Sequence, residues 1–125
     1  MNIKLISIII FTILLIGCSY KQPLYTSSAI IIFKTPQIKF YDKGFITKYT
    51  NHIHLQIFQV GNLVLDLKIY KNTICQSTLK CMSSKEFNKK YLHKSYEDDF
   101  LYRTFSKENI AYKDTINKIL IKVKK

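Results

Sequence analysis

Residues His52 to Tyr70 read HIHLQIFQV-GN-LVLDLKIY, and this stretch decides the fold. Two runs rich in branched and aromatic residues, His52–Val60 and Leu63–Tyr70, flank Gly61-Asn62. A two-residue loop that begins with glycine is typical of a β-hairpin with a primed turn. We therefore expect a long central hairpin that closes at Gly61-Asn62.

Both faces of this hairpin carry apolar residues. Closing the turn at Gly61-Asn62 places Phe58, Leu65 and Leu67 on one face, whereas Ile53, Leu55, Ile57 and Val64 lie on the other. An antiparallel sheet with one solvated face normally shows one polar face. We therefore expect helices to cover one side, and the second apolar face to line a cavity or meet a partner. A small two-layer core is the alternative, because it would also make both faces partly apolar.

The flanking sequence supplies further strands and two short helices. Before the hairpin, the patterns predict strands at Ala29–Phe33, Gln37–Tyr41 and Phe45–Tyr49, with a turn at Asp42-Lys43-Gly44. After it come a loop from Tyr70 to Cys81, a helix over Ser84–Leu92 capped by Ser83 and Glu86, and a second helix capped by Ser95 with a Phe100, Leu101 and Phe105 stripe. Strands at Ile110–Lys113 and Ile119–Lys124 close the chain. The expected fold class is α+β, with a small curved antiparallel sheet of about five or six strands covered on one side by the two helices.

The amino terminus carries a second strong pattern. Lys4 precedes an apolar run from Leu5 to Ile16, which ends in Leu15-Ile16-Gly17-Cys18. About 12 apolar residues are too few to cross a bilayer as a helix, which needs about 20, and they suit the centre of a secretory signal peptide. A buried element of a cytosolic protein is the alternative, which the order of charge, apolar run and small-residue–cysteine junction disfavours.

The stretch Leu15-Ile16-Gly17-Cys18 resembles the lipobox of bacterial lipoproteins. The resemblance implies cleavage after Gly17 and acylation of Cys18 with palmitate-like chains, so that the mature chain is anchored in a membrane. Residues 1–17 are then the signal peptide, 18–28 the acylated cysteine and its tether, and 29–125 a single domain. In that family an Asp after the cysteine favours the inner membrane; because Ser19 stands there, we expect the periplasmic face of the outer membrane.

The other two cysteines, Cys75 and Cys81, form a candidate pair. An exported protein meets an oxidising compartment, in which paired cysteines form disulfides. A redox motif needs two residues between its cysteines, and here there are five. A zinc site needs more ligands than two cysteines and a stray histidine. We expect a structural disulfide.

The formal net charge of +12 raises the question of an anionic partner. Nucleic-acid sites depend on arginine forks, whereas Arg103 is the only arginine and the lysines are scattered. We therefore expect no nucleic-acid partner. Attraction to anionic lipid head groups fits an exported, anchored chain better.

Residues capable of catalysis are sparse. His52 and His54 are two apart on an expected strand and share a face, but no third metal ligand lies within predictable reach. Asp98 and Asp99 are neighbours on an expected helix, so they do not face each other as a catalytic pair would, and helix capping is their expected role. No nucleophile elbow, phosphate loop or metalloprotease helix is present. We expect no enzyme activity, no cofactor and no metal.

Two further resemblances concern the domain. The segments 33–40, 81–88, 91–92, 95–101 and 112–123 resemble a group of small, mostly uncharacterised lipoproteins of Campylobacter, Helicobacter and their relatives, which implies a location rather than a mechanism. The order of strands, hairpin, helices and closing strands is also similar in outline to the LolB-type outer-membrane lipoprotein receptor, whose half-open sheet takes up acyl chains. That likeness implies a non-catalytic module for lipid or lipoprotein acyl chains, with Phe58, Leu65 and Leu67 as the expected contacts. Docking to an envelope protein complex through the same apolar face is the alternative.

Overall fold

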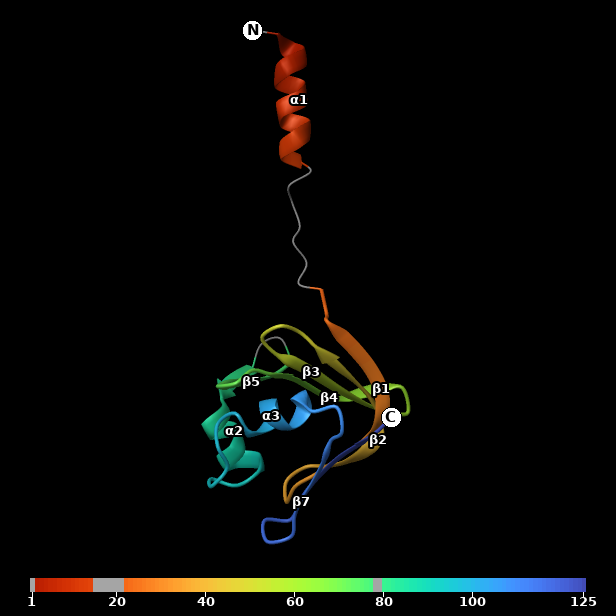
Figure 1. Cartoon of the computed structure of the whole chain (residues 1–125), viewed down its shortest axis with the longest axis vertical. Helices are drawn as coiled ribbons and strands as arrows, with labels where there is room; N and C mark the ends of the chain where they lie inside the picture. The colour runs from red at the N-terminus through yellow and green to blue at the C-terminus, as the bar shows by residue number, and fades with distance from the viewer. Residues whose placement is uncertain (1, 15–21, 78–79) are drawn as a thin grey trace.

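The computed structural model describes residues 2–14, 22–77 and 80–125. In chain order the elements of this part are α1 (Ile3–Leu14), β1 (Tyr25–Lys34), β2 (Lys39–Lys48), β3 (Ile53–Gln59), β4 (Asn62–Ile69), β5 (Thr73–Gln76), β6 (Lys80–Ser83), α2 (Ser84–Tyr91), α3 (Phe100–Ser106), β7 (Ala111–Asp114) and β8 (Ile119–Lys124). Figure 1 shows α1 apart from the sheet, and the core contains no residue of α1.

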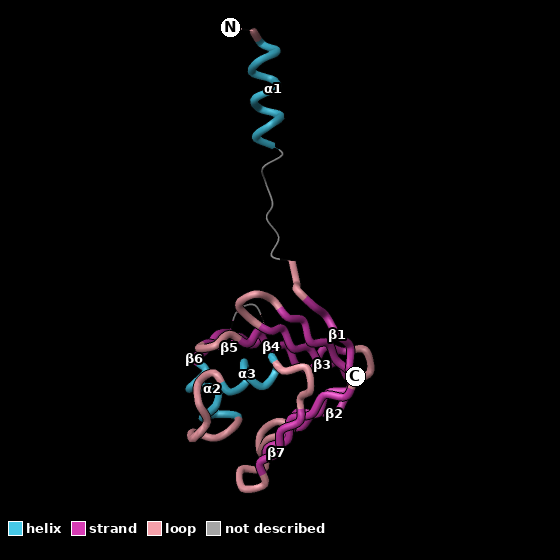
Figure 2. Tube along the Cα trace, viewed as in Figure 1, coloured by secondary structure: helices cyan, strands magenta, loops and turns pink. Residues whose placement is uncertain are grey.

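The strands form one open antiparallel sheet in the order β6-β5-β4-β3-β2-β1-β8-β7. The sheet is curved, and the two later helices lie together on one side of it (Figures 1 and 2). The expected α+β class is confirmed. The expected sheet of five or six strands was too small, because the described chain forms an 8-stranded sheet. The difference comes partly from the predicted loop between Tyr70 and Cys81, which contains β5 and the start of β6.

The central hairpin is present, but its turn lies one residue earlier than predicted. Gln59 pairs with Asn62, so the turn residues are Val60 and Gly61, with φ of 51° and 79°. Two central residues with positive φ are what a type I′ turn requires. The register then shifts between Ile57 and Phe58, so that the residue opposite Leu65 is Ile57 and not Phe58, as the sequence predicted. This shift reassigns the two faces of the hairpin.

The predicted turn at Asp42-Lys43-Gly44 is wrong, because β2 runs unbroken through it. Glycine is needed at position 44 because the strands pack closely there, and not because the backbone adopts a positive φ. A Cβ built on Gly44 would lie 2.2 Å from the carbonyl oxygen of Gln56 in β3 and 2.5 Å from Cδ1 of Ile31 in β1. Only glycine lets the three strands approach this closely.

One face of the sheet packs against the two helices and forms the core. Its largest fully buried side chains include Phe33 of β1, Phe87 of α2 and Phe105 of α3. The rings of Phe33 and Phe105 stack with centroids 6.2 Å apart, which ties α3 to the middle of the sheet. The side of the sheet beneath the helices is therefore filled by side chains.

The helix termini agree with the sequence in one case and differ in the other. Ser83 caps α2 as predicted, because its Oγ accepts the backbone N–H of Glu86 at 3.2 Å. Ser95 does not cap α3; the helix starts at Phe100 after Asp99, and Ser95 hydrogen-bonds to His93 instead. Asp99 contacts Arg103 one turn later at 3.0 Å.

An aromatic cluster joins the loop before α3 to the β7–β8 hairpin. The Tyr96 hydroxyl donates to Oδ2 of Asp114 at 2.5 Å, and the backbone N–H groups of Ile116 and Asn117 donate to Oδ1 of the same carboxylate. The Tyr96 hydrogen bond, followed by those from Asn117, lowers the pKa of Asp114 to about 2. Burial raises the pKa of the Tyr96 hydroxyl above its usual value.

The disulfide between Cys75 and Cys81 is confirmed, and it joins paired positions of β5 and β6.

β1 begins at Tyr25, so residues 25–28 belong to the sheet rather than to the predicted tether. Cys18 and the rest of the lipobox lie outside the described residues. α1 has 12 residues, and within the described chain no helix combines the length and apolar character needed to cross a membrane.

Candidate functional site: an apolar groove on the helix-free face

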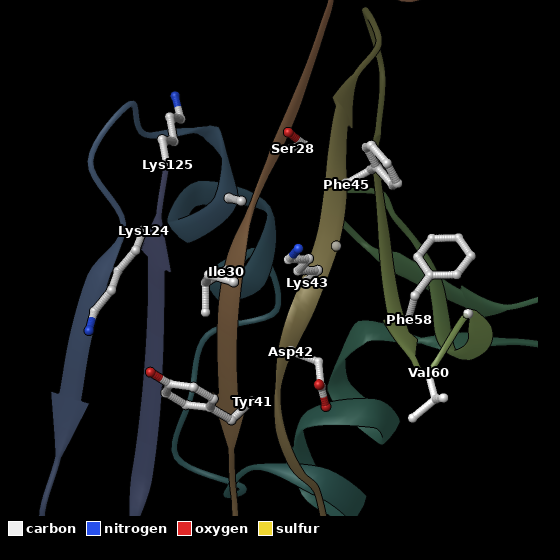
Figure 3. A pocket seen from close by; sticks show the side chains of 13 residues that line it. Ser28, Ile30, Tyr41, Asp42, Lys43, Phe45, Phe58, Val60, Lys124 and Lys125 are labelled. Atoms are coloured by element: carbon white, nitrogen blue, oxygen red, sulfur yellow. The ribbon is translucent and has the colours of Figure 1, made fainter.

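A concavity lies on the side of the sheet that the helices leave open. It is an open groove of about 1020 Å³, and its side chains come from β1, β2, the end of β3 and the turn that follows it, and the end of β8. Figure 3 shows these side chains toward the viewer, with the helices behind the strands. Pockets that bind small ligands are typically about 300–1,000 Å³, so the groove is large enough for one.

Aromatic and aliphatic side chains form the floor and one wall of this groove. The rings of Phe45 and Phe58 meet edge to face with centroids 5.8 Å apart. Phe45 is 41% exposed, Tyr41 is 55% exposed and Val60, at the tip of the turn, is 97% exposed. Solvated faces of antiparallel sheets normally carry polar residues, so this exposed apolar group suggests a binding surface.

Lysines border the groove. Lys43 of β2 and Lys124 of β8 are exposed, and Lys125 lies with its Nζ 5.4 Å from the ring centre of Tyr25. Asp42 is the one carboxylate that lines the groove, and it accepts a hydrogen bond from Gln59 at 3.3 Å. Ion pairs of the described residues involve His54 and Arg103, so neither Lys43 nor Lys124 is neutralised by a carboxylate in this part of the chain.

The structure separates the three residues that the sequence predicted as ligand contacts. Phe58 lines the groove, as expected. Leu67 is 0% exposed beneath the helices, and Leu65 packs against the same core. The cause is the register shift between Ile57 and Phe58: beyond it Leu65 pairs with Ile57 instead of Phe58, and a shift of one residue moves a side chain to the opposite face.

Sequence reasoning missed Ile30, Tyr41, Phe45 and Val60 as groove residues. The signal for Phe45 was present, because an unbroken β2 places it beside Lys43 and Tyr41 in alternation. The false turn at Gly44 concealed that pattern. Ile30 joins the groove only through the pairing of β1 with both β2 and β8, which no local pattern reveals.

The histidines and acidic residues considered for catalysis do not form one site. His52 precedes β3 and is buried between the rings of Tyr49 and Tyr70, with centroids 4.4 and 4.8 Å away. His54 hydrogen-bonds to Asp66 on the neighbouring strand β4. Within residues 2–14, 22–77 and 80–125, no group of three or more His, Cys, Asp or Glu side chains could hold a metal ion.

Asp98 and Asp99 lie at the start of α3, on the other side of the sheet from His54. Asp99 is the N-cap residue of α3 and makes no side-chain capping hydrogen bond.

Comparisons of the chain with protein-family models, curated proteins and solved structures give no match. The fold and the groove are therefore the grounds for a functional proposal.

Proposed function

We propose that this chain is a lipid-anchored protein of the bacterial cell envelope, and that its groove binds an acyl chain of a lipid or of another lipoprotein. The observation that carries the proposal is the open apolar groove on the helix-free face. Phe45 and Phe58 provide adjoining rings, and Ile30 and Val60 extend the apolar lining. An acyl chain needs such a lining, because burying each methylene contributes about 0.8 kcal/mol.

The amino-terminal sequence and the disulfide both support the anchor. The basic residue, the short apolar run and the lipobox-like stretch predict acylation of Cys18. The Cys75–Cys81 disulfide fits an exported protein, because such bonds persist in oxidising compartments. The location proposed is the periplasmic face of the outer membrane.

Lipid analysis of the purified protein tests the groove. The full chain is extracted from cell membranes and examined by native mass spectrometry, with Phe45→Ser/Phe58→Ser as the test variant. Ile116→Ser is the matched control, because Ile116 is exposed at 90% but lies on the turn between β7 and β8. We expect lipid with the wild type and the control, and its loss from the double variant.

The alternative, docking to an envelope protein through the same face, gives a different result. Chemical crosslinking in membranes would then recover one stoichiometric protein partner, and no lipid would accompany the purified chain. Equal amounts of lipid with all three chains would also contradict the proposal, since the bound lipid would not depend on the groove.

A further inference from the structure

Strand register gathers six lysines on the helix-free face around the groove. Because residues paired across strands share a face, as do alternate residues of one strand, the register with β1 places them together. The exposed lysines of this face are Lys34, Lys39, Lys43, Lys113, Lys122 and Lys124. The residues that the register places with them on β1, β2, β7 and β8 include no acidic one. We name this surface the lysine face.

Apolar side chains lie between these lysines. Half-buried Ile30 and buried Ile32 of β1 occupy the same face, flanked by Tyr41 on β2, which is exposed, and by Lys122 and Lys124 on β8. Lysine stems can cover apolar neighbours while their ammonium groups reach outward. A surface with apolar residues inside a ring of lysines matches the boundary of a lipid leaflet, where anionic head groups surround acyl chains.

We propose that the lysine face docks the domain onto an anionic lipid leaflet, so that the groove opens toward the membrane. This inference rests on the proposed anchor at Cys18, but not on the ligand of the groove. The charge is available for the contact because the ion pairs of the described chain involve none of the six lysines. Lysines that share one face can all attract a membrane surface lying within the Debye length, which is about 8 Å at physiological salt.

The chain length near the anchor permits this orientation. Six residues separate Cys18 from Tyr25, the first residue of β1, so the connection reaches at most about 25 Å. Ile30 lies five residues along β1 from Tyr25, or about 17 Å. The strand that follows the anchor is thus the same strand that forms the middle of the lysine face.

A tryptophan reporter tests the docking, because the chain contains no Trp. Tyr41→Trp reports the lysine face, and Tyr102→Trp on α3 reports the opposite side of the domain. Each full chain is reconstituted into vesicles of phosphatidylcholine alone or with about one third phosphatidylglycerol. Brominated lipids and an aqueous quencher then measure the exposure of each reporter.

We expect phosphatidylglycerol to increase bromolipid quenching of the Tyr41→Trp reporter at least threefold over aqueous quenching, and to leave the Tyr102→Trp reporter unchanged. The variant Lys43→Gln/Lys122→Gln, introduced with the reporter, should lower the docking equilibrium by on the order of tenfold. The control Lys85→Gln/Lys89→Gln on α2 should have no such effect. Salt at 1 M should abolish the difference between the vesicles.

Equal quenching of the Tyr41→Trp reporter on both kinds of vesicle overturns the docking proposal, as does a lysine control that acts as strongly as the test variant. The Cys18→Ser chain examines the anchor separately. Loss of its association with phosphatidylcholine vesicles reports the acyl chains, whereas the difference between the two compositions reports the lysine face. The lipid content of the purified protein reports the groove, so failure of any one of the three claims can be distinguished from failure of the others.

Discussion

Replacing Gly44 by alanine tests the closest approach of strands in the sheet. The new Cβ would lie 2.2 Å from the carbonyl oxygen of Gln56, whereas an ordinary contact is 3.4 Å or more. β2 and β3 would therefore have to separate locally by about 1.2 Å, the difference between these distances. The atom in the way belongs to the backbone of a paired strand, so a change of side-chain rotamer cannot relieve the contact.

The cost follows from two effects. Overpacking a closely packed site costs about 1–3 kcal/mol, and each buried backbone hydrogen bond lost as the strands part adds about 1 kcal/mol or more. Alanine restricts the unfolded chain and recovers only about 0.4–1 kcal/mol. We expect Gly44→Ala to lower the free energy of unfolding by about 3 kcal/mol, a large part of the about 5–15 kcal/mol of a typical domain. For a domain of this size the midpoint of thermal unfolding falls by roughly 12–24 °C.

Urea unfolding followed by circular dichroism measures the change, and Gly61→Ala is the matched control. Gly61 has open space around it but a φ of +79°, so alanine there costs about 1–2 kcal/mol through backbone strain alone. Asparagine tolerates this conformation, so Gly61→Asn should be milder than Gly61→Ala, whereas Gly44→Asn should be at least as harmful as Gly44→Ala. A Gly44→Ala chain within 1 kcal/mol of the wild type would refute the pairing of Gly44 with Ile57 and the unbroken course of β2.

Three other outcomes are expected. The Cys18→Ser chain should lose labelled palmitate and leave the membrane fraction, whereas the Cys75→Ser/Cys81→Ser chain should keep its palmitate and stay in the membrane fraction. Palmitate on the Cys18→Ser chain would contradict the anchor. The same double cysteine variant should lower the free energy of unfolding by about 2–2.5 kcal/mol in urea, because the disulfide closes a short loop with a sequence separation of 6. Asp114 has a folded-state pKa lowered from 3.8 to about 2, so its contribution to stability is complete above about pH 4 and is lost as the pH falls through 2. Tyr96→Phe removes the main cause of that shift, so its stability deficit in urea should be largest at neutral pH and shrink by pH 2; a deficit independent of pH would contradict this account.

The local parts of the fold could be predicted from the sequence, because each depends on neighbouring residues. The hairpin follows from two branched runs around a glycine, the Ser83 cap from residues three apart, and β8 from simple alternation between Ile119 and Lys124. β5 and β6 escaped prediction because each has only four residues and few apolar positions. Their pairing depends on the edge that β4 offers and on the disulfide between them.

The groove could not be predicted, because it depends on register and on contacts between distant strands. Val60 adopts a positive φ that branched residues rarely accept, so the sequence favoured Gly61 as the first turn residue. The register shift between Ile57 and Phe58 escaped prediction as well, so Phe58 was expected on the same face as Leu67, although they lie on opposite faces. The lysine face depends equally on β8 pairing with β1, which joins residues about 90 positions apart. Scattered lysines in the sequence thus become one surface only because the last strand returns beside the first, so a sheet that failed to pair β8 with β1 would lose the lysine border of the groove at Lys124 and half of the lysine face.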